Sequence, residues 1–341
     1  MKVVHWNISK KSHPMFGLKK YEDELFNHLR KMKVEWEIER VWRGEGKIRG
    51  STVASWISYK SNDADIVHAT SQTIAPAVYL TGQKRFIVTV HDLAPMVYPS
   101  EIKDISMKIQ FLLTPKALKR AEKIIAISEF TKKELIRLVG ADEDRISVVH
   151  LGVDHERYRP LDTIRCKERL GLNPDEKHIL VVSSNLEHKR MDLAKKVFNN
   201  VRAVRKDVKM IKAGYGEVLL GEGIASLGWV SEEDMPTLMN AADVYLHTSE
   251  YEGFGLTVLE AMACGVPLVV SNKASIPEVV GEYEKTADES LGNYVDQFVD
   301  SVLKKIDNGK DEKAKERSKK FSWRRTAEET AKIYEETLKE V

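Results

Sequence analysis

Two carboxylates, Glu252 and Glu260, stand on either side of a glycine-containing turn. We expect a strand that ends at His247 before the turn and a helix that begins at about Gly255 after it. Gly253 and Gly255 would let a ligand approach closely, and the unpaired N–H groups of a first helical turn suit a phosphate or a developing oxyanion. The segment therefore combines an anion-binding helix terminus with two flanking carboxylates.

The spacing of these carboxylates differs from that of a glycosidase acid/base pair. Eight positions separate them, which corresponds to about 12 Å along a helix, whereas glycosidase carboxyl groups lie roughly 5 to 9.5 Å apart. The pair fits the two ends of an extended ligand better than a single bond. On spacing alone, a loop carboxylate followed by a helix-surface carboxylate, with no ligand, explains the pattern equally well.

A basic pair, Lys189 and Arg190, is expected where a strand ends and a second helix begins. Cations are disfavoured at a helix N-terminus, because the helix dipole is positive there. A basic pair in that place therefore suggests an arranged anion site. Without further context, the pair is more simply explained as solvated surface.

The apolar run Phe86–Val90 predicts a buried strand that places His91 and Asp92 at its carboxyl end. Ligands of open parallel sheets bind beyond the carboxyl ends of the strands. His91 is therefore a candidate site residue, although a single histidine in such a place more often makes a structural hydrogen bond.

Two further patterns point to a metal and to a dinucleotide, and both are weak. Asp63 and Asp65 form a D-x-D, but they precede the predicted strand 66–69 instead of following it, so we expect a loop and a strand start without a metal. Gly214 and Gly216 match half of a dinucleotide fingerprint and lack its third glycine. Neither pattern indicates a cofactor.

Short apolar runs alternate with longer helical patterns along the whole chain, which is typical of βαβ units around parallel sheets. The polar segment 157–175 is predicted to link two series of strands. We expect an α/β protein with two doubly wound domains, 1–160 and 161–320, that face each other across a cleft, and an amphipathic helix over 321–341 that packs back toward the N-terminal domain. The predicted strands cover residues 2–8, 34–42, 66–69, 85–90, 124–127 and 146–150, then 178–183, 208–213, 243–247 and 267–271.

Composition limits the class of protein. The 341 residues, 42% of them hydrophobic, suffice for two cores, and a net charge of +2 argues against a nucleic-acid partner. Cys166 and Cys264 are too few for a disulfide framework or a four-ligand zinc site, which suggests a reducing compartment and a cytoplasmic location. We expect no signal segment and no membrane span.

One tract, residues 107–120, mixes large apolar side chains with basic ones. Such a tract suits an anionic membrane surface. A core-facing helix with a solvated basic face explains it more simply. Pro115 is expected to interrupt any long helix there.

The segment Ser249–Pro267, with its E-x7-E at Glu252 and Glu260, resembles retaining glycosyltransferases of family 4, which have the GT-B fold of two Rossmann-like domains. Further stretches resemble landmarks of this family in the expected order. They are residues 127–135, 151–154, 227–230, 276–281 and 321–323.

The resemblance implies roles for the E-x7-E segment. Glu252 would contact the donor sugar and Glu260 would bind the ribose hydroxyls. The backbone of Gly253, Phe254 and Gly255 would contact the sugar and the diphosphate.

It also implies roles for residues elsewhere in the chain. Lys189 and Arg190 resemble the diphosphate-binding Arg-Lys region, in reversed order and with Ser183 where glycine is usual. His91 resembles the histidine at the donor hexose, which makes His91 and Glu252 the candidate catalytic residues. Gly17 stands where relatives carry a glycine-rich turn, and it is a candidate for a loop that approaches a phosphate or the acceptor.

The expected function is transfer of a hexose from a nucleoside diphosphate sugar, with GDP-mannose or a UDP-hexose favoured, to a hydroxyl of a glycan, a lipid-linked or a small-molecule acceptor. The acceptor would bind the N-terminal domain and the donor the C-terminal domain. The reaction would retain configuration and need no metal or other cofactor, in the cytoplasm or peripherally on the inner face of the membrane. The alternatives are an epimerase-type or phosphorylase-type GT-B enzyme and a noncatalytic sugar-nucleotide-binding protein.

Overall fold

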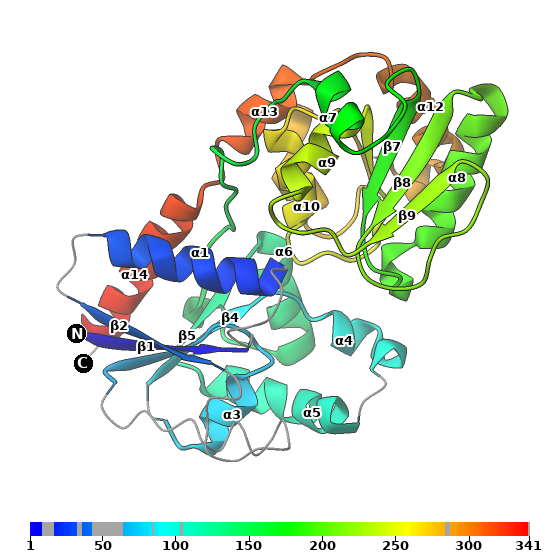
Figure 1. Ribbon diagram of the computed structural model, residues 1–341. Helices are drawn as coiled ribbons and strands as arrows, with labels where there is room; N and C mark the ends of the chain where they lie inside the picture. The colour runs from blue at the N-terminus through cyan, green and yellow to red at the C-terminus, as the bar shows by residue number, and fades with distance from the viewer. Residues whose placement is uncertain are drawn as a thin grey trace. The chain divides into compact units, whose positions relative to one another are not determined.

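The chain folds as two compact units in the computed structural model, which describes residues 1–8, 17–32, 36–42, 64–83, 85–102, 105–283 and 287–339. Unit 1 comprises Met1–Gly152 and Trp323–Val341, and unit 2 comprises Val153–Ser322 (Figure 1). Residues 153–160, which we expected in the N-terminal domain, thus belong to unit 2. Val153 forms a β-bridge with Ser322, and the Tyr158 hydroxyl donates to Glu232, both within that unit.

Unit 1 is built on one fully parallel sheet. Its strands are β1 (Lys2–Asn7), β2 (Glu37–Trp42), β3 (Ile66–Ala69), β4 (Phe86–Val90), β5 (Lys123–Ala126) and β6 (Ile146–Val148). Its helices are α1 (Gly17–Lys31), α3 (Ala75–Leu80), α4 (Ala94–Val97), α5 (Ile105–Arg120), α6 (Glu129–Glu134) and α14 (Trp323–Lys339), with a π-helical turn over Leu135–Val139. The strands lie in the order β2-β1-β3-β4-β5-β6.

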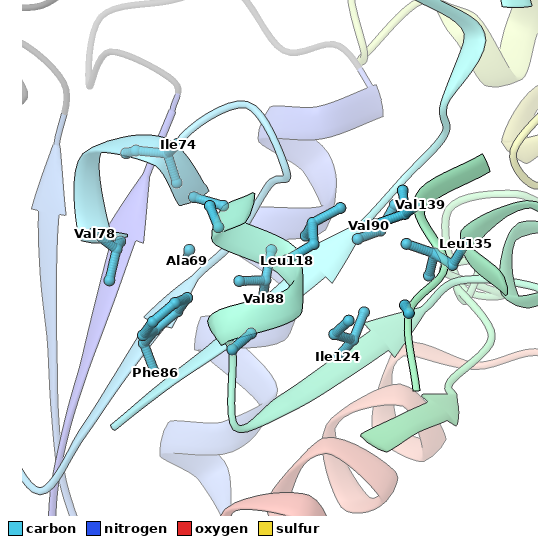
Figure 2. Packing of buried hydrophobic residues seen from close by; sticks show 14 of the residues in the cluster. Ala69, Ile74, Val78, Phe86, Val88, Val90, Leu118, Ile124, Leu135 and Val139 are labelled. Carbon is cyan, nitrogen blue, oxygen red and sulfur yellow. The ribbon is translucent and has the colours of Figure 1, made fainter. Parts of the chain in front are cut away.

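One face of this sheet packs on α3 and α5. Because side chains alternate along a strand, Phe86, Val88 and Val90 of β4 all point to this face, where they meet Val78 of α3 and Leu118 of α5 (Figure 2). These side chains form the main apolar core of unit 1. The core holds the carboxyl end of β4, and with it His91, in place.

The opposite face of the sheet, under α1 and α14, carries a buried polar network. The Tyr334 hydroxyl of α14 lies 3.0 Å from His5 Nε2 and 2.6 Å from His68 Nδ1. His68 Nε2 is 2.8 Å from Thr89 Oγ1, which is 2.7 Å from the Tyr21 hydroxyl of α1. Hydrogen bonds therefore link both covering helices to three strands.

Helix α5 continues through Pro115, against our expectation of an interruption. Proline removes one backbone hydrogen bond, and the burial of Thr114, Ala117 and Leu118 around it holds the helix together. Among the described residues, no helix is both long enough and apolar enough to cross a membrane.

Unit 2 is a second, fully parallel α/β sheet. Its strands are β7 (Lys177–Val182), β8 (Val208–Ala213), β9 (Ile224–Gly228), β10 (Val244–His247) and β11 (Leu268–Val270). Its helices are α7 (Thr163–Arg169), α8 (Met191–Val204), α9 (Met235–Ala241), α10 (Leu256–Ala263), α11 (Ile276–Val280), α12 (Tyr294–Lys305) and α13 (Glu312–Ser318).

The strand order of unit 2, β11-β10-β7-β8-β9, locates its binding edge. From β7 the chain builds the sheet outward through β8 and β9, and then returns to β10 on the other side. Ligands of doubly wound sheets bind at this switch point, beyond the carboxyl ends of the strands that flank it. In unit 2 these strands are β7 and β10.

Two elements of unit 2 differ from the sequence prediction. Strand β9 was not predicted, because it is an edge strand whose Ala225 and Leu227 are exposed and which lacks a clear apolar pattern. Helix α7 lies inside the segment 157–175 that we predicted as a linker. The Asp162 side chain caps it, and the ammonium of the buried Lys167 pairs with Asp243 at 2.8 Å.

Candidate functional site

Two loops meet at the switch point of unit 2, one after β7 and one after β10. The backbone N–H of Glu250 donates to the His188 carbonyl at 2.8 Å. The Thr248 hydroxyl lies 3.2 Å from the Lys189 carbonyl and 3.1 Å from the Arg190 carbonyl. These bonds hold the loops together and bring the predicted residues Lys189, Arg190 and Glu252 into one place.

At the centre of this place, Lys189 and Glu252 form an ion pair. Lys189 Nζ donates to Glu252 Oε1 at 2.7 Å, and both side chains are mostly buried. His247 Nε2 lies 3.4 Å from the same carboxylate oxygen. Sequence analysis assigned Lys189 to the diphosphate and Glu252 to the sugar, and the structure places the two side chains in direct contact.

The charges around Glu252 decide its protonation. Burial alone would raise the pKa of this carboxyl, but the Lys189 ammonium, His247 and a hydrogen bond from Ser249 outweigh burial and lower the pKa to about 2. Glu252 is therefore ionised at neutral pH. Burial lowers the pKa of His247 to about 4, so this imidazole is neutral.

The N-terminus of α10 has the geometry of an anion site. Gly255 precedes the helix at φ +97°, in the left-handed region that favours glycine, and no side-chain cap is present there among the described residues. A Cβ at Gly255 would lie 2.7 Å from Ile276 Cδ1. Ser275 holds the loop between β10 and α10, since its hydroxyl donates to the Glu252 carbonyl at 2.9 Å. The first-turn N–H groups can thus meet an anion.

The remaining predicted residues of the E-x7-E segment are buried. The ring of Phe254 packs edge-on against Phe321 at 5.7 Å, so only the backbone of Gly253, Phe254 and Gly255 can face a ligand. Glu260 of α10 is 5% exposed. Its charge adds to the effect of burial in raising the pKa of the Tyr158 hydroxyl and of the Cys264 thiol.

Arg190 occupies a strained position at the start of α8. Its φ of +51° and ψ of +48° lie in the left-handed region, which glycine adopts at lower cost. Its guanidinium lies 3.6 Å from Glu250 and 3.7 Å from Asp192. Strained residues that persist are typical of functional sites.

Replacing Arg190 by glycine is expected to stabilise unit 2 and to weaken binding of a nucleoside diphosphate. Relief of the left-handed strain, less the added freedom of glycine in the unfolded chain, amounts to roughly 0.5–1 kcal/mol. Ala274→Gly is the matched control, because Ala274 has φ +53° and carries no charge. Thermal melts and diphosphate titrations check this; an Arg190→Gly protein that binds the diphosphate normally would contradict the role of Arg190.

The turn with Gly214 and Gly216 packs against the loop after β7, which gives these glycines a structural reason. A Cβ at Gly214 would lie 2.3 Å from the Ser183 carbonyl oxygen, and one at Gly216 would lie 2.5 Å from Asn185 Oδ1. The buried Lys212 donates to the Gly214 carbonyl at 3.0 Å. Close packing on the loop after β7 thus explains why Gly214 and Gly216 match half of a dinucleotide fingerprint.

In unit 1, His91 lies at the carboxyl end of β4, as predicted, and is partly exposed. Gly17 is the exposed first residue of α1. Asp65 precedes β3 and accepts a hydrogen bond from the Lys2 N–H at 2.8 Å, while Asp63 lies outside the described residues. Over the described ranges, no group of three or more His, Cys, Asp or Glu side chains could hold a metal ion.

Sequence analysis missed three residues that shape the site, namely His247, Thr248 and Ser275. All three follow or end strands of unit 2 near the switch point, and all are buried. Polar residues at the ends of β10 and β11 were the available signal. The partners of Thr248 in the loop after β7, the carbonyls of Lys189 and Arg190, could not be read from the sequence, because more than fifty positions separate them.

Buried neutral histidines predict a loss of stability in acid. Burial lowers the pKa of His5 well below its usual value and that of His68 to about 3, and His247 behaves likewise. The unfolded chain takes up these protons below about pH 6.5, whereas the folded chain does not, so unfolding becomes easier as the pH falls. For His247 the loss approaches about 3 kcal/mol by pH 4.

Glu252 adds to this loss at lower pH. Its lowered pKa contributes stability that is present above about pH 4.5 and disappears as the pH falls toward 2. Denaturant unfolding at pH 7.5, 6 and 5 measures the histidine part. Equal free energies of unfolding at these three values would contradict the assignment of neutral buried imidazoles.

Comparisons with known proteins identify the family. Residues 162–321 match the family of group 1 glycosyl transferases, and residues 41–157 match glycosyltransferase family 4. The O-antigen chain mannosyltransferase B of Escherichia coli is 30% identical over 76% of this chain and 72% of its own length. The chain belongs to glycosyltransferase family 4.

Other glycosyltransferases are related over a shorter part of their length. The D-inositol 3-phosphate glycosyltransferase 2 of Catenulispora acidiphila is 30% identical over 65% of this chain, which spans 57% of that relative. This chain has the GT-B fold of glycosyltransferases, with two parallel-sheet domains. Sucrose-phosphate synthase of Thermosynechococcus elongatus matches all of both chains at a TM-score of 0.80 and 16% identity. HepE of Anabaena, in complex with UDP-glucose, matches 98% of this chain and 100% of its own at 0.70 and 18%.

Proposed function

We propose that this glycosyltransferase moves a hexose from a nucleoside diphosphate sugar to a hydroxyl acceptor, with retention of configuration and without a metal. The observation that carries the proposal is the convergence of Lys189, Glu252 and the uncapped N-terminus of α10 at the switch point of unit 2. This place offers positive charge to a diphosphate and a carboxylate to the sugar.

The chemistry follows from these charges. Departure of the nucleoside diphosphate develops negative charge, which Lys189, Arg190 and the first-turn N–H groups of α10 stabilise. Glu252, ionised with a pKa of about 2, cannot serve as the proton donor and instead stabilises positive charge on the sugar ring. The leaving phosphate oxygen accepts the proton of the incoming hydroxyl on the same face of the sugar, which forms the new glycosidic bond with retention.

Three further roles complete the donor site. Glu260 binds the ribose hydroxyls, the backbone of Gly253, Phe254 and Gly255 contacts the sugar and the diphosphate, and His91 orients the donor hexose. Carboxylates accept hydrogen bonds from hydroxyls, and backbone N–H groups donate hydrogen bonds to anions, so each role matches the chemistry of its group.

The favoured donors are GDP-mannose and a UDP-hexose. The name of the Escherichia coli relative supports a mannosyl donor, and the HepE complex with UDP-glucose supports a uridine donor on the same fold. A glycan, a lipid-linked and a small-molecule acceptor are the classes to test, and the inositol phosphate in the names of other relatives adds a soluble candidate.

A thermal-shift panel with UDP, GDP, ADP, CMP and NAD tests the donor site. A ligand that binds only the folded state stabilises it by about 2.7 kcal/mol at one hundred times its Kd. We expect one nucleoside diphosphate to raise the melting temperature more than the others do. A melting temperature that rises with NAD alone, or that rises with none of the five ligands, would contradict the proposal.

Metal independence has its own test. Because Lys189, Arg190 and the α10 terminus supply the positive charge, transfer is expected to continue in EDTA at its full rate. Strict dependence on an added divalent ion would contradict this and would direct attention to Asp63 and Asp65.

We also assign a peripheral membrane contact to α5 of unit 1. Leu112 is 76% exposed on this helix, and Lys108 and Lys116 beside it are exposed. Apolar and basic groups together suit an anionic lipid surface. Flotation with vesicles that contain anionic lipid is expected to carry the protein, and Leu112→Asp to release it; equal recovery without vesicles would contradict the contact.

A further inference from the structure

His91 is held at three points by one short loop of unit 1. Its ring Nε2 lies 2.9 Å from the Thr70 carbonyl oxygen. Its backbone N–H donates to Gln72 Oε1 at 3.1 Å, and Gln72 Nε2 donates to the carbonyl of the next residue, Asp92, at 2.9 Å. The Gln72 side-chain amide thus brackets the two-residue backbone segment of His91 and Asp92.

Other contacts make this bracket rigid. Gln72 is 5% exposed, and Thr70 is fully buried. The Thr70 hydroxyl lies 2.7 Å from Glu22 Oε1 of α1, which fixes the peptide whose carbonyl meets His91. The ring of Tyr21, also on α1, packs edge-on against the His91 ring at 4.8 Å. The imidazole therefore has little freedom to rotate.

The chemistry of the Thr70 contact fixes the tautomer. A carbonyl oxygen only accepts hydrogen bonds, so Nε2 must carry the hydrogen. Burial lowers the pKa of His91 to about 4, against the opposing effect of the Thr70 carbonyl, so the ring is neutral at pH 7. Nδ1 then carries a lone pair, and it has no hydrogen-bond partner within the described parts of the chain.

We propose that Gln72, with the Thr70 carbonyl, is a positioning residue that holds His91 as the Nε2–H tautomer, so that Nδ1 accepts a hydrogen bond from a substrate hydroxyl. The inference rests on the proposed function, in which His91 orients the donor hexose. It adds the direction of the bond: the group that faces His91 is a donor. The diphosphate of a sugar nucleotide or a carboxylate, which is ionised and only accepts hydrogen bonds at neutral pH, does not fit there.

Nitrogen-15 NMR of the imidazoles measures the tautomer directly. With the His91 signal assigned by its loss in His91→Ala, we expect a protonated Nε2 and an unprotonated Nδ1 in the parent protein at pH 7. In Gln72→Met, which removes both bonds of the bracket and so frees the His91 ring to leave the Thr70 carbonyl, we expect a mixture of tautomers. A protonated Nδ1 in the parent, or an unchanged tautomer in Gln72→Met, would overturn the inference.

Kinetics separate positioning from general damage. Gln72→Met is expected to lower kcat about tenfold and to leave the Kd of the nucleoside diphosphate unchanged, because that ligand binds unit 2. Gln297→Met is the matched control, because the Gln297 amide makes a similar pair of backbone bonds in unit 2, of 2.9 Å each, to the N–H and the carbonyl of Asp288. Equal kcat in Gln72→Met and the parent, or equal losses in both variants, would overturn the positioning role.

A second variant guards against misfolding. Gln72→Glu keeps the acceptor for the His91 N–H and adds a negative charge beside the ring, so the His91 pKa is expected to rise. An unmoved pKa would contradict the bracket. A failure of the proposed function is distinguished from a failure of this inference by His91→Ala. If that variant retains full kcat, His91 has no role in transfer. The NMR measurement decides the tautomer independently of this result.

Discussion

Replacing Glu252 by glutamine is expected to lower kcat at least about 100-fold, which is the size of effect seen when one preorganised electrostatic partner is removed. Glutamine keeps the shape of the side chain and can still accept the 2.7 Å bond from Lys189. It cannot offer the negative charge that stabilises the sugar ring as the donor bond breaks. Initial rates at saturating donor and acceptor measure the effect.

Glu250→Gln is the control for this variant. Glu250 lies two positions away in the same loop and is half-exposed, and its carboxylate lies 3.6 Å from the Arg190 guanidinium. We expect its kcat to stay within about twofold of the parent, as is usual for surface changes. Similar rates in Glu252→Gln and Glu250→Gln would remove Glu252 from the reaction.

Replacing Lys189 by methionine is expected to weaken binding of the nucleoside diphosphate roughly 10- to 100-fold and to leave the nucleoside unaffected. A hydrogen bond to a charged group contributes about 1.5–3 kcal/mol, and only the diphosphate can form it. Methionine preserves the apolar stem that packs in the loop. Calorimetric titration with the matching diphosphate and nucleoside pair compares the two losses.

Lys189 also neutralises Glu252, so the variant needs a control for structural damage. Lys196→Met makes the same change on the exposed side of α8, and we expect it to bind both ligands normally. If Lys189→Met loses the nucleoside and the diphosphate to the same extent, Lys189 supports the fold of the loop and has no direct part in phosphate binding.

The architecture was largely predictable from the sequence, because apolar runs such as Phe86–Val90 alternate with helical patterns throughout both units. The exceptions have local physical causes. Strand β9 lies at the sheet edge with exposed side chains, and α7 looks polar because its buried Lys167 is paired with Asp243. The hydrophobic periodicity of a sequence does not show that a charged residue is buried in a salt bridge.

The candidate site was predictable residue by residue but not as a set of contacts. E-x7-E and the basic pair located Glu252 and Lys189, whereas their direct ion pair depends on the meeting of two loops at the switch point. The left-handed backbone of Arg190 is likewise invisible in the sequence. His247 was not predicted, because the sequence does not distinguish a histidine of the site from a structural histidine at the end of a strand.

The most direct test of the account is product analysis with GDP-mannose and UDP-hexoses, against glycan, lipid-linked and small-molecule acceptors. We predict that one nucleoside diphosphate is released in step with a new glycoside, whose anomeric proton shows by NMR the same configuration as the donor. An inverted glycoside would contradict the retaining mechanism. An epimerised sugar without acceptor, or tight donor binding with no product across the whole acceptor panel, would contradict the assignment of transfer itself.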